Sequence, residues 1–418
     1  MTSLIPEYFD SKTDNDLPSE ELDTENTLPL APAMIDWKLL AAIIGLVMFG
    51  LVMITSASMP FAAKNYGDPF FFAMRQCIYT GLGLLVALLV FNIPTRQLER
   101  YGPLLLMFSI VLLALVFVPG LGKTVNGSRR WLELGPLNVQ VSEAVKLFII
   151  IYLAGYLVRR VDMVRSSLKG FVMPMLIISI ADFLLLMEPD FGAAVIITAT
   201  AVVMLFVAGV KWRQFASLLG ALMIVGILLI LIEPYRAERF SSFLDPFGDP
   251  FGAGFQLTQS LIAIGSGSWF GVGLGSSVQK LFYLPEAHTD FVFAILSEEL
   301  GLVGSLCVIA TYVFLLWRGY LVSRAAHALG NHFSAYVALG ISTWLGMQAF
   351  VNIGVNVGLL PTKGITLPML SYGGSSALIF SMAFAILLRI DYENRLHARE
   401  SLKPSRREQV KRAGRVYA

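Results

Sequence analysis

The stretch Leu284-Pro285-Glu286-Ala287-His288-Thr289-Asp290-Phe291 joins a polar segment, residues 233–290, to the apolar run that follows it. Pro285 favours an extended entry, and either Thr289 or Asp290 can cap the first turn of a helix. A helix that begins here places Asp290 at a membrane boundary, at the base of the longest polar loop. We therefore expect chemistry at Asp290, and an ordinary N-capping role is the simpler alternative.

The composition of the chain excludes a water-soluble globule. Its 418 residues are 56% hydrophobic and only 14% charged, with a mean hydropathy of +0.70, which leaves too little polar surface to cover a soluble fold. The sequence thus predicts an integral membrane protein. The formal net charge of +2 gives no reason to expect a nucleic-acid partner. Cys77 and Cys307 both fall in apolar runs, so we expect no disulfide.

Ten apolar runs follow one another, each of about 18 to 25 residues and long enough to cross roughly 30 Å of hydrocarbon as a helix. We predict an all-α polytopic membrane domain over residues 37–390, with residues 233–290 as a large extracytoplasmic loop between helices seven and eight. Residues 1–36 hold nine acidic residues against one lysine and are predicted to be a flexible tail. Residues 391–418 form a basic tail. The runs lie at 37–57, 72–93, 101–119, 140–158, 170–187, 190–208, 213–232, 291–317, 333–358 and 369–390.

Basic residues set the expected orientation. With the N-terminus in the cytoplasm, 21 of the 31 lysines and arginines fall in cytoplasmic segments and nine fall outside. Both termini are therefore predicted to be cytoplasmic, and the loops near 119–139, 233–290 and 359–368 share the opposite face. The glycine-rich run Gly265–Gly275 is expected to pack against the bundle, because irregular backbone is not left exposed to lipid.

Two charges lie inside the span that begins at Gln140. Glu143 and Lys146 are three residues apart and share one face of the helix. A charge within a span costs about 2.5 to 3.5 kcal/mol, so such residues face a cavity and find a partner. One interpretation is an ion pair that neutralises itself. The other is that Lys146 reaches an outward-open polar cavity and meets Asp290, where it would lower the pKa of that carboxyl.

Residues on either side of Asp290 are further candidates. His288 has an unperturbed pKa near 6.5 and, in an extended segment, points to the same side as Asp290. His288 and Glu286 are the alternative bases. Glu298 and Glu299 lie about two turns deeper in the helix. We expect one of them to face the cavity, in a role that is either structural or functional.

Three loop motifs complete the polar face. Asn126-Gly127-Ser128-Arg129-Arg130-Trp131 combines a turn, two cations and an indole, which suits either a pyrophosphate head group or interfacial anchoring. Glu188-Pro189-Asp190 is interpreted as a structural turn in which Asp190 caps the next helix. The segments Leu360–Pro368 and Ser371–Ser376 interrupt a regular span and suit close helix packing or an unwound cavity wall. The sequence has no metal-ligand spacing, no phosphate loop and no extracytoplasmic Ser-His-Asp set.

These motifs resemble the SEDS family (shape, elongation, division and sporulation) over residues 37–395. The chain is most similar to the cell-division member rather than the elongation member, on the basis of Glu188–Phe191, Pro361–Gly364 and the long N-terminal tail. Val141 departs from the proline that the family usually has there. The motifs, in the family's order, are Asn126-Gly127 through Arg130-Trp131, Gln140 through Lys146, Glu188 through Gly192, Leu284 through Phe291, Ser297 through Gly301, and Leu360 through Ser376.

The resemblance implies a ten-helix, inverting peptidoglycan glycosyltransferase that polymerises lipid II at the outer face of the bacterial inner (cytoplasmic) membrane, at the division septum. It places the catalytic aspartate on Asp290. The departing pyrophosphate needs positive charge, for which a divalent cation (Mg²⁺ or Mn²⁺) is a further candidate, and no other cofactor is expected. The residues expected to bind substrate are Lys146, Glu143, Arg130, His288, Glu286, Lys363 and Ser371.

The resemblance also implies partners. These are lipid II, polyprenyl-pyrophosphate-linked glycan, membrane lipids, a class B penicillin-binding protein (an FtsI-like transpeptidase) and a divisome complex that activates synthesis. Three alternative functions remain open at this point. They are a lipid II flippase, an elongation-type polymerase and a non-catalytic scaffold that recruits the transpeptidase.

Overall fold

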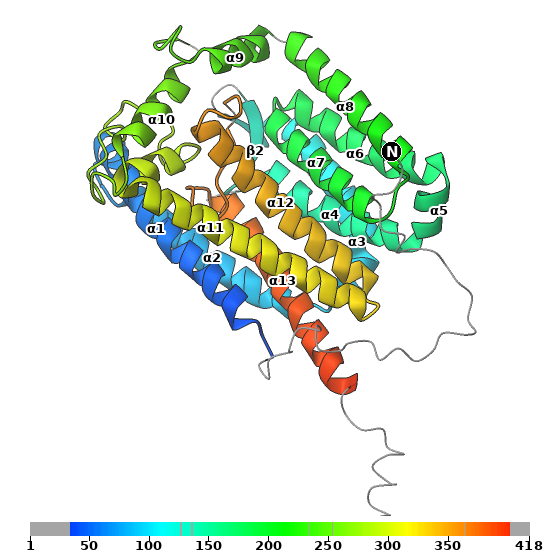
Figure 1. Cartoon of the computed structure of the whole chain (residues 1–418). Coiled ribbons are helices and arrows are strands. Elements are labelled where there is room, and N and C mark those ends of the chain that lie inside the picture. Colours follow the sequence, from blue (N-terminus) through cyan, green and yellow to red (C-terminus); the bar gives the residue numbers. More distant parts are fainter. Residues whose placement is uncertain are drawn as a thin grey trace, which may run out of the picture.

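A computed structural model describes residues 34–401, apart from 126–127, 135–136, 233, 253 and 363. It shows a bundle of long helices that carries short helices and a small sheet at one end (Figure 1). The helices are α1 Trp37–Tyr66, α2 Phe71–Phe91, α3 Thr95–Val116, α4 Val141–Arg159, α5 Val161–Ser166, α6 Leu168–Met187, α7 Phe191–Val207, α8 Trp212–Ile232, α9 Pro234–Leu244, α10 Phe255–Ser266, α11 Val292–Ala328, α12 His332–Asn356 and α13 Gly374–Ser401, and the strands are β1 Gly122–Val125, β2 Ser128–Leu134 and β3 Leu137–Gln140.

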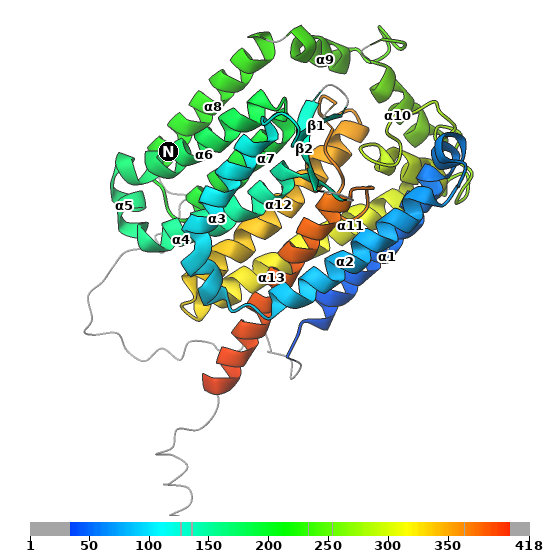
Figure 2. The same ribbon diagram turned by 180° about the vertical axis from the view of Figure 1, so that it is seen from behind.

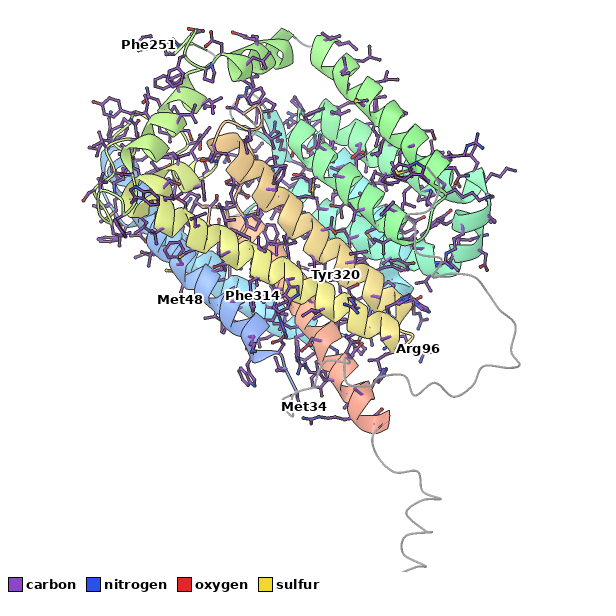
Figure 3. The ribbon with its side chains drawn as sticks, viewed as in Figure 1. Met34, Met48, Arg96, Phe251, Phe314 and Tyr320 are labelled. Atoms are coloured by element: carbon purple, nitrogen blue, oxygen red, sulfur yellow. The ribbon has the colours of Figure 1, made fainter. Side chains whose placement is uncertain are left out.

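Each of the ten predicted spans coincides with a helix. Within the described part of the chain, nine helices are long and apolar enough to cross a membrane, and α7 is a shorter apolar helix of 17 residues. The helices α4, α12 and α13 are mostly buried, whereas the apolar stretch of α8 has no buried residue. Met48 and Tyr320 extend outward from α1 and α11 as exposed apolar side chains (Figure 3). The prediction of a mostly helical, polytopic membrane protein is therefore confirmed.

A three-stranded antiparallel sheet, in the order β1-β2-β3, corrects the all-α prediction. It forms where the sequence predicted an external loop, and it lies at the same end of the bundle as α10 (Figure 2). Val125 pairs with Ser128 in the first hairpin, and Asn126 and Gly127 lie outside the described residues. The loop folds into strands because its backbone N–H and carbonyl groups need partners beside an apolar bundle. The sheet leads directly into α4 through Gln140, whose N–H donates to Ser375 Oγ at the start of α13 (3.1 Å).

The glycine-rich run before α11 packs against that helix, as predicted. Helix α11 is interrupted at Gly301, which has a φ of 66°. The carbonyls of Glu298 and Glu299 accept hydrogen bonds from Val272 and Gly273 (2.9 and 3.0 Å). Glycine is required at the break because a Cβ on Gly301 would collide with the backbone nitrogen of Gly271. The glycine-rich loop thus donates hydrogen bonds to carbonyls of α11 next to the point where this helix is interrupted.

Both glutamates after Asp290 anchor this same loop, which favours the structural alternative for them. Glu298 accepts from Ser277 Oγ (2.5 Å) and from the N–H of Val278 (2.9 Å). The loop ammonium of Lys280 lies 2.6 Å from Glu299 Oε1, and both side chains are buried. Ser56 of α1 donates to the Glu299 carboxylate (2.7 Å), so three parts of the chain meet in one buried ion pair.

We predict that Lys280→Met destabilises the protein strongly, because Glu299 then stays charged and buried without its cation. Removal of one partner from a buried ion pair costs about 3–5 kcal/mol. Thermal unfolding in detergent should show a clear loss of stability, and the double variant Lys280→Met/Glu299→Gln should regain part of it. Lys123→Met is the matched control, because Lys123 and Glu133 form an exposed pair that contributes about 0–1 kcal/mol. Equal effects of the two single variants would contradict this account.

Candidate functional site

Asp290 lies in a turn, and not in the extended segment that the sequence suggested. The N–H groups of Thr289 and Phe291 both donate to the Glu286 carbonyl (3.2 and 3.3 Å), and Glu286 has a φ of 53°. Helix α11 has Phe291 as its N-cap residue, and no side chain of Thr289 or Asp290 caps it. The N-capping alternative for Asp290 is therefore wrong.

Two buried asparagines of α12 replace the missing cap. The side chain of Asn356 accepts a hydrogen bond from the N–H of Ala294 in the first turn of α11 (3.1 Å). The side-chain amides of Asn352 and Asn356 also donate to the backbone carbonyl of Asp290 (2.8 and 3.1 Å). The backbone of Asp290 is thereby held in place, while no described residue donates a hydrogen bond to its carboxyl group.

Asp290 is partly buried, and its carboxyl accepts no hydrogen bond and forms no ion pair among the described residues. A Cβ built on Gly364 would lie 3.1 Å from its Oδ2. Burial raises the pKa of Asp290 to about 7, and the nearby Glu286 raises it as well. Arg130 and Arg239 act in the opposite direction and lower the pKa. This carboxyl is consequently poised to exchange a proton near neutral pH.

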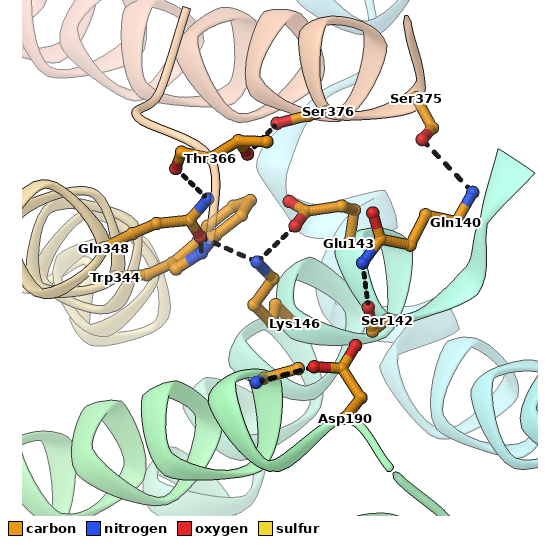
Figure 4. Close-up of polar contacts among 11 residues, drawn as sticks. Gln140, Ser142, Glu143, Lys146, Asp190, Trp344, Gln348, Thr366, Ser375 and Ser376 are labelled. Atoms are coloured by element: carbon orange, nitrogen blue, oxygen red, sulfur yellow. Dashed lines mark hydrogen bonds and ion pairs between the residues drawn. The ribbon is translucent and has the colours of Figure 1, made fainter. Parts of the chain in front are cut away.

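Lys146 forms a buried ion pair with Glu143, and it does not meet Asp290 as one interpretation expected. Its Nζ lies 2.7 Å from Glu143 Oε1 and 2.7 Å from Gln348 Oε1, as Figure 4 shows. No ion pair links Lys146 to Asp290 in the described part of the chain. Glu143 and Lys146 lie within one turn of α4, so the positive charge of Lys146 is neutralised by the same helix. Glu143 and Asp290 therefore do not share Lys146 as a counter-ion.

Gln348 is a connecting residue that the sequence interpretation missed. Its Oε1 also accepts from Trp344 Nε1 (2.9 Å), and its Nε2 donates to the carbonyl of Thr366 (3.1 Å). Gln348, Asn352 and Asn356 recur at a spacing of four along α12 and are all fully or almost fully buried. Three amide side chains on one face of an apolar helix indicate a polar interface, and this spacing is visible in the sequence.

A pocket lies beside this interface, between α4, α7 and the segment that precedes α13. It encloses about 290 Å³, including the part open to solvent, and Lys146 stands between it and a second, apolar hollow. Gly364 belongs to the pocket wall, and a Cβ at this residue would lie 3.1 Å from Asp290 Oδ2, so the two features adjoin. The pocket is lined by Gln140, Ser142, Glu143, Lys146, Asp190, Ala193, Ile196, Gly364, Ile365 and Thr366.

Arg130 of β2 is held over the turn between α6 and α7. Its Nε and Nη2 donate to the carbonyls of Glu188 and Pro189 (3.2 and 2.5 Å). Burial and the neighbouring Asp190 raise the pKa of Glu188 to about 8, and Arg130 lowers it. Asp190 accepts from the N–H of Ala193 (3.2 Å), so its predicted capping of α7 is confirmed.

The remaining predicted residues are more dispersed. His288 is buried among the rings of Phe61, Phe72 and Tyr372, and burial lowers its pKa. Glu286 is exposed and accepts from Thr289 Oγ1 (2.8 Å).

The last two predicted residues lie beyond α12. Ser371 is buried and its hydroxyl accepts from the N–H of Leu367 (2.8 Å), which closes a turn. Lys363 lies outside the described residues, so the structure neither supports nor opposes its assignment. Within the described ranges, no group of three or more His, Cys, Asp or Glu side chains could hold a metal ion.

Comparisons with known proteins identify the family. The model of the FtsW, RodA and SpoVE family, described as "Cell cycle protein", matches residues 37–396. The chain belongs to this family. The match includes both the pocket and Asp290, and it agrees with the family resemblance seen in the sequence motifs.

Two relatives and two solved structures show how similar this chain is to other members of the family. The protein of Thioalkalivibrio sulfidiphilus is 55% identical over 86% of this chain and 90% of its own length, and that of Legionella pneumophila is 50% identical over 87% and 92%. Both are named "Probable peptidoglycan glycosyltransferase FtsW". Among solved structures, a peptidoglycan synthase complex matches with a TM-score of 0.71 at 32% identity, over 86% of this chain and 98% of that one. The rod shape determining protein RodA of Thermus thermophilus matches with 0.63 at 31%, over 86% and 97%.

We predict that Asn356→Ala lowers thermal stability, because it removes the cap of α11 and a donor to Asp290. Each buried group left unpaired costs about 1–3 kcal/mol. Asn65→Ala is the control, because Asn65 makes one exposed hydrogen bond to Phe61. Thermal unfolding of both variants in the same detergent provides the measurement. A stability loss in Asn65→Ala as large as that in Asn356→Ala would show that the α12 asparagine has no special role.

Proposed function

We propose that this chain is a peptidoglycan glycosyltransferase that polymerises lipid II during septal wall synthesis in cell division. The observation that carries the proposal is the Asp290 carboxyl. Hydrogen bonds to the backbone of Asp290 fix its position. Among the described residues, the carboxyl neither caps a helix nor forms an ion pair, and its pKa is raised to about 7. Family membership and the shared description of close relatives support the reaction class.

The chemistry at Asp290 follows from its pKa. An acid with a pKa near the working pH is an efficient general base. Asp290 takes the proton from the 4-hydroxyl of one lipid II sugar, whose oxygen then bonds to the anomeric carbon of the growing glycan. The bond from that carbon to the polyprenyl pyrophosphate breaks, and the leaving group departs with its electron pair. Attack from the opposite face inverts an α-linked donor into a β linkage without a covalent enzyme intermediate.

The cations near Asp290 are the proposed contacts for the pyrophosphate. Arg130 and Arg239 both act electrostatically on Asp290 from separate elements, β2 and α9. Arginine matches phosphate oxygens with a planar fork of donors. Lys363 is a further candidate by its position in the sequence next to Gly364. Glu286, His288 and Ser371 keep their proposed roles near the substrate, with His288 and Ser371 acting from buried positions.

The membrane arrangement belongs to the same proposal. Ten spans with both termini in the cytoplasm place Asp290, the sheet and the pocket at the outer face of the inner membrane. The solved synthase complex that this chain resembles couples polymerisation and crosslinking. We therefore infer a class B penicillin-binding protein as the partner, together with a divisome complex that activates synthesis at the septum.

We predict that Asp290→Asn lowers lipid II polymerisation by about 10²- to 10⁴-fold, the usual contribution of a general base. The assay uses the full chain with its transpeptidase partner and lipid II in detergent, and glycan products are separated by length. Asp182→Asn is the matched control, because Asp182 is a buried acid of α6 that bonds to Thr198, away from the pocket. It should polymerise at the normal rate.

Two outcomes would count against this assignment. Unchanged polymer from a folded Asp290→Asn protein would move the base to His288 or Glu286. Lipid translocation in vesicles without any polymer from the unaltered chain would instead identify a flippase.

The pH profile provides an independent prediction. Because the ionised form of Asp290 is the base, the rate should be full above a pH of about 7 and fall as pH decreases through its pKa. Glu286→Gln removes a charge that raises the pKa, so this limb should move to lower pH. Arg239→Gln removes a charge that lowers the pKa, so the limb should move to higher pH. Initial polymerisation rates between pH 5 and 9 measure both shifts.

The control for this series is Arg96→Gln, an exposed position at the far end of the bundle (Figure 3). Its profile should match that of the unaltered chain. Shifts of Glu286→Gln and Arg239→Gln in the same direction would show that a group other than Asp290 sets the limb.

A further inference from the structure

Two carboxylates line the pocket beside Asp290, and each has one oxygen that no described residue uses. Glu143 Oε2 and Asp190 Oδ2 are both buried and have no hydrogen-bond partner among the described residues. The two side chains are only 5% and 4% exposed, and both line the pocket. Their other oxygens are engaged, by Lys146 and by the N–H of Ala193. A buried acceptor without a donor is costly, so the pocket is built for a ligand that donates hydrogen bonds.

The charged side chains that line the pocket, among the described residues, disfavour a phosphate group as that ligand. Lys146 is neutralised by Glu143, is also bonded to Gln348, and faces the ring of Trp344 at 5.3 Å (Figure 4). Asp190 adds a second negative charge, and Lys146 is the one cation among the described residues that line the pocket. The arginines that act on Asp290 are not part of the lining. Sugar hydroxyls and amide N–H groups are donors without charge, and they fit this set of acceptors.

Gly364 is the residue at which the pocket comes close to Asp290, the proposed general base. It lines the pocket, and the Cβ that it lacks would lie 3.1 Å from Asp290 Oδ2. A general base must come within about 2.6–3.2 Å of the hydroxyl whose proton it takes. A sugar in this pocket would lie next to Gly364, and a hydroxyl at its edge would face Asp290. The acceptor sugar meets this requirement.

We propose, on the basis of the function proposed above, that this pocket is the subsite for the acceptor sugar of lipid II. Asp190 and Glu143 bind the hydroxyl and acetamido N–H groups of the sugar through their unused oxygens. The pyrophosphate of the donor lies near Arg130 and Arg239, the two arginines that act on Asp290. Asp190 is therefore a substrate ligand in addition to the cap of α7.

The variant Asp190→Asn tests this role with little change to the fold. Asparagine is as good an N-cap as aspartate, so the bond to Ala193 is retained. The free acceptor oxygen becomes an NH₂ donor, which cannot bind a donating sugar group. Glu143→Gln is the second variant, since its carbonyl oxygen can still accept from Lys146. Asp182→Asn is the matched control, because Asp182 also has one bonded and one unpartnered oxygen but does not line the pocket.

Binding is measured on the full chain in detergent with three separate probes: the lipid-free N-acetylglucosaminyl-N-acetylmuramic acid disaccharide, inorganic pyrophosphate and Mn²⁺. We expect Asp190→Asn and Glu143→Gln to weaken disaccharide binding by about 10- to 100-fold. Pyrophosphate binding should stay within twofold. Asp182→Asn should leave all three probes unaffected. In polymerisation, Asp190→Asn should raise the KM for lipid II by a similar factor while kcat changes little.

Three results would overturn the subsite. They are disaccharide binding that both variants leave intact, a loss of pyrophosphate binding in Asp190→Asn, and a loss of Mn²⁺ binding that would make the pocket a cation site. Failure of the proposed function looks different. The unaltered chain would then bind the disaccharide in a manner sensitive to Asp190→Asn and yet form no polymer.

Discussion

Three buried amides on one face of α12 hold the functional end of this molecule together. These side chains form hydrogen bonds with the start of α11, with the irregular segment before α13 and with Lys146 of α4. They belong to Gln348, Asn352 and Asn356. An amide offers both donors and an acceptor without carrying a charge. It can therefore satisfy interrupted backbone inside an apolar bundle at a lower cost than an ionised group. The helices could not end and restart around the pocket without such partners.

This arrangement gives Asp290 a fixed backbone and a carboxyl that is not paired within the described part of the chain. Because Asn356 supplies the cap of α11, the aspartate is spared the role that its sequence position suggests. Burial alone would suppress its ionisation at neutral pH, and two arginines from β2 and α9 oppose that effect. The sheet and the long segment between α8 and α11 thus contribute to the acidity of a residue that neither element carries.

Two different charge environments adjoin at the site. In the pocket, the pair of Glu143 and Lys146 is neutral and Asp190 offers an acceptor of hydrogen bonds. Asp290, beside Gly364 of the pocket wall, lies within the influence of Arg130 and Arg239. A reaction between an uncharged sugar and a charged pyrophosphate donor needs two such environments in close contact. A Cβ at Gly364 would lie 3.1 Å from Asp290 Oδ2, so a larger side chain there would press on this carboxyl.

The sequence by itself determined the helical spans, the packing of the glycine-rich run and the cap that Asp190 provides. These features depend on local properties, namely apolar length, the absence of side chains and the spacing of a capping residue. The family motifs also indicated Asp290. Only the tertiary structure decided that the segments 122–125, 128–134 and 137–140 form a sheet, that Lys146 bonds to Gln348, and that Asn356 caps α11. The sheet is local in sequence, but it forms beside an apolar bundle that the loop sequence does not describe. The other two contacts join groups far apart in the chain, and no local pattern names the partner of either group.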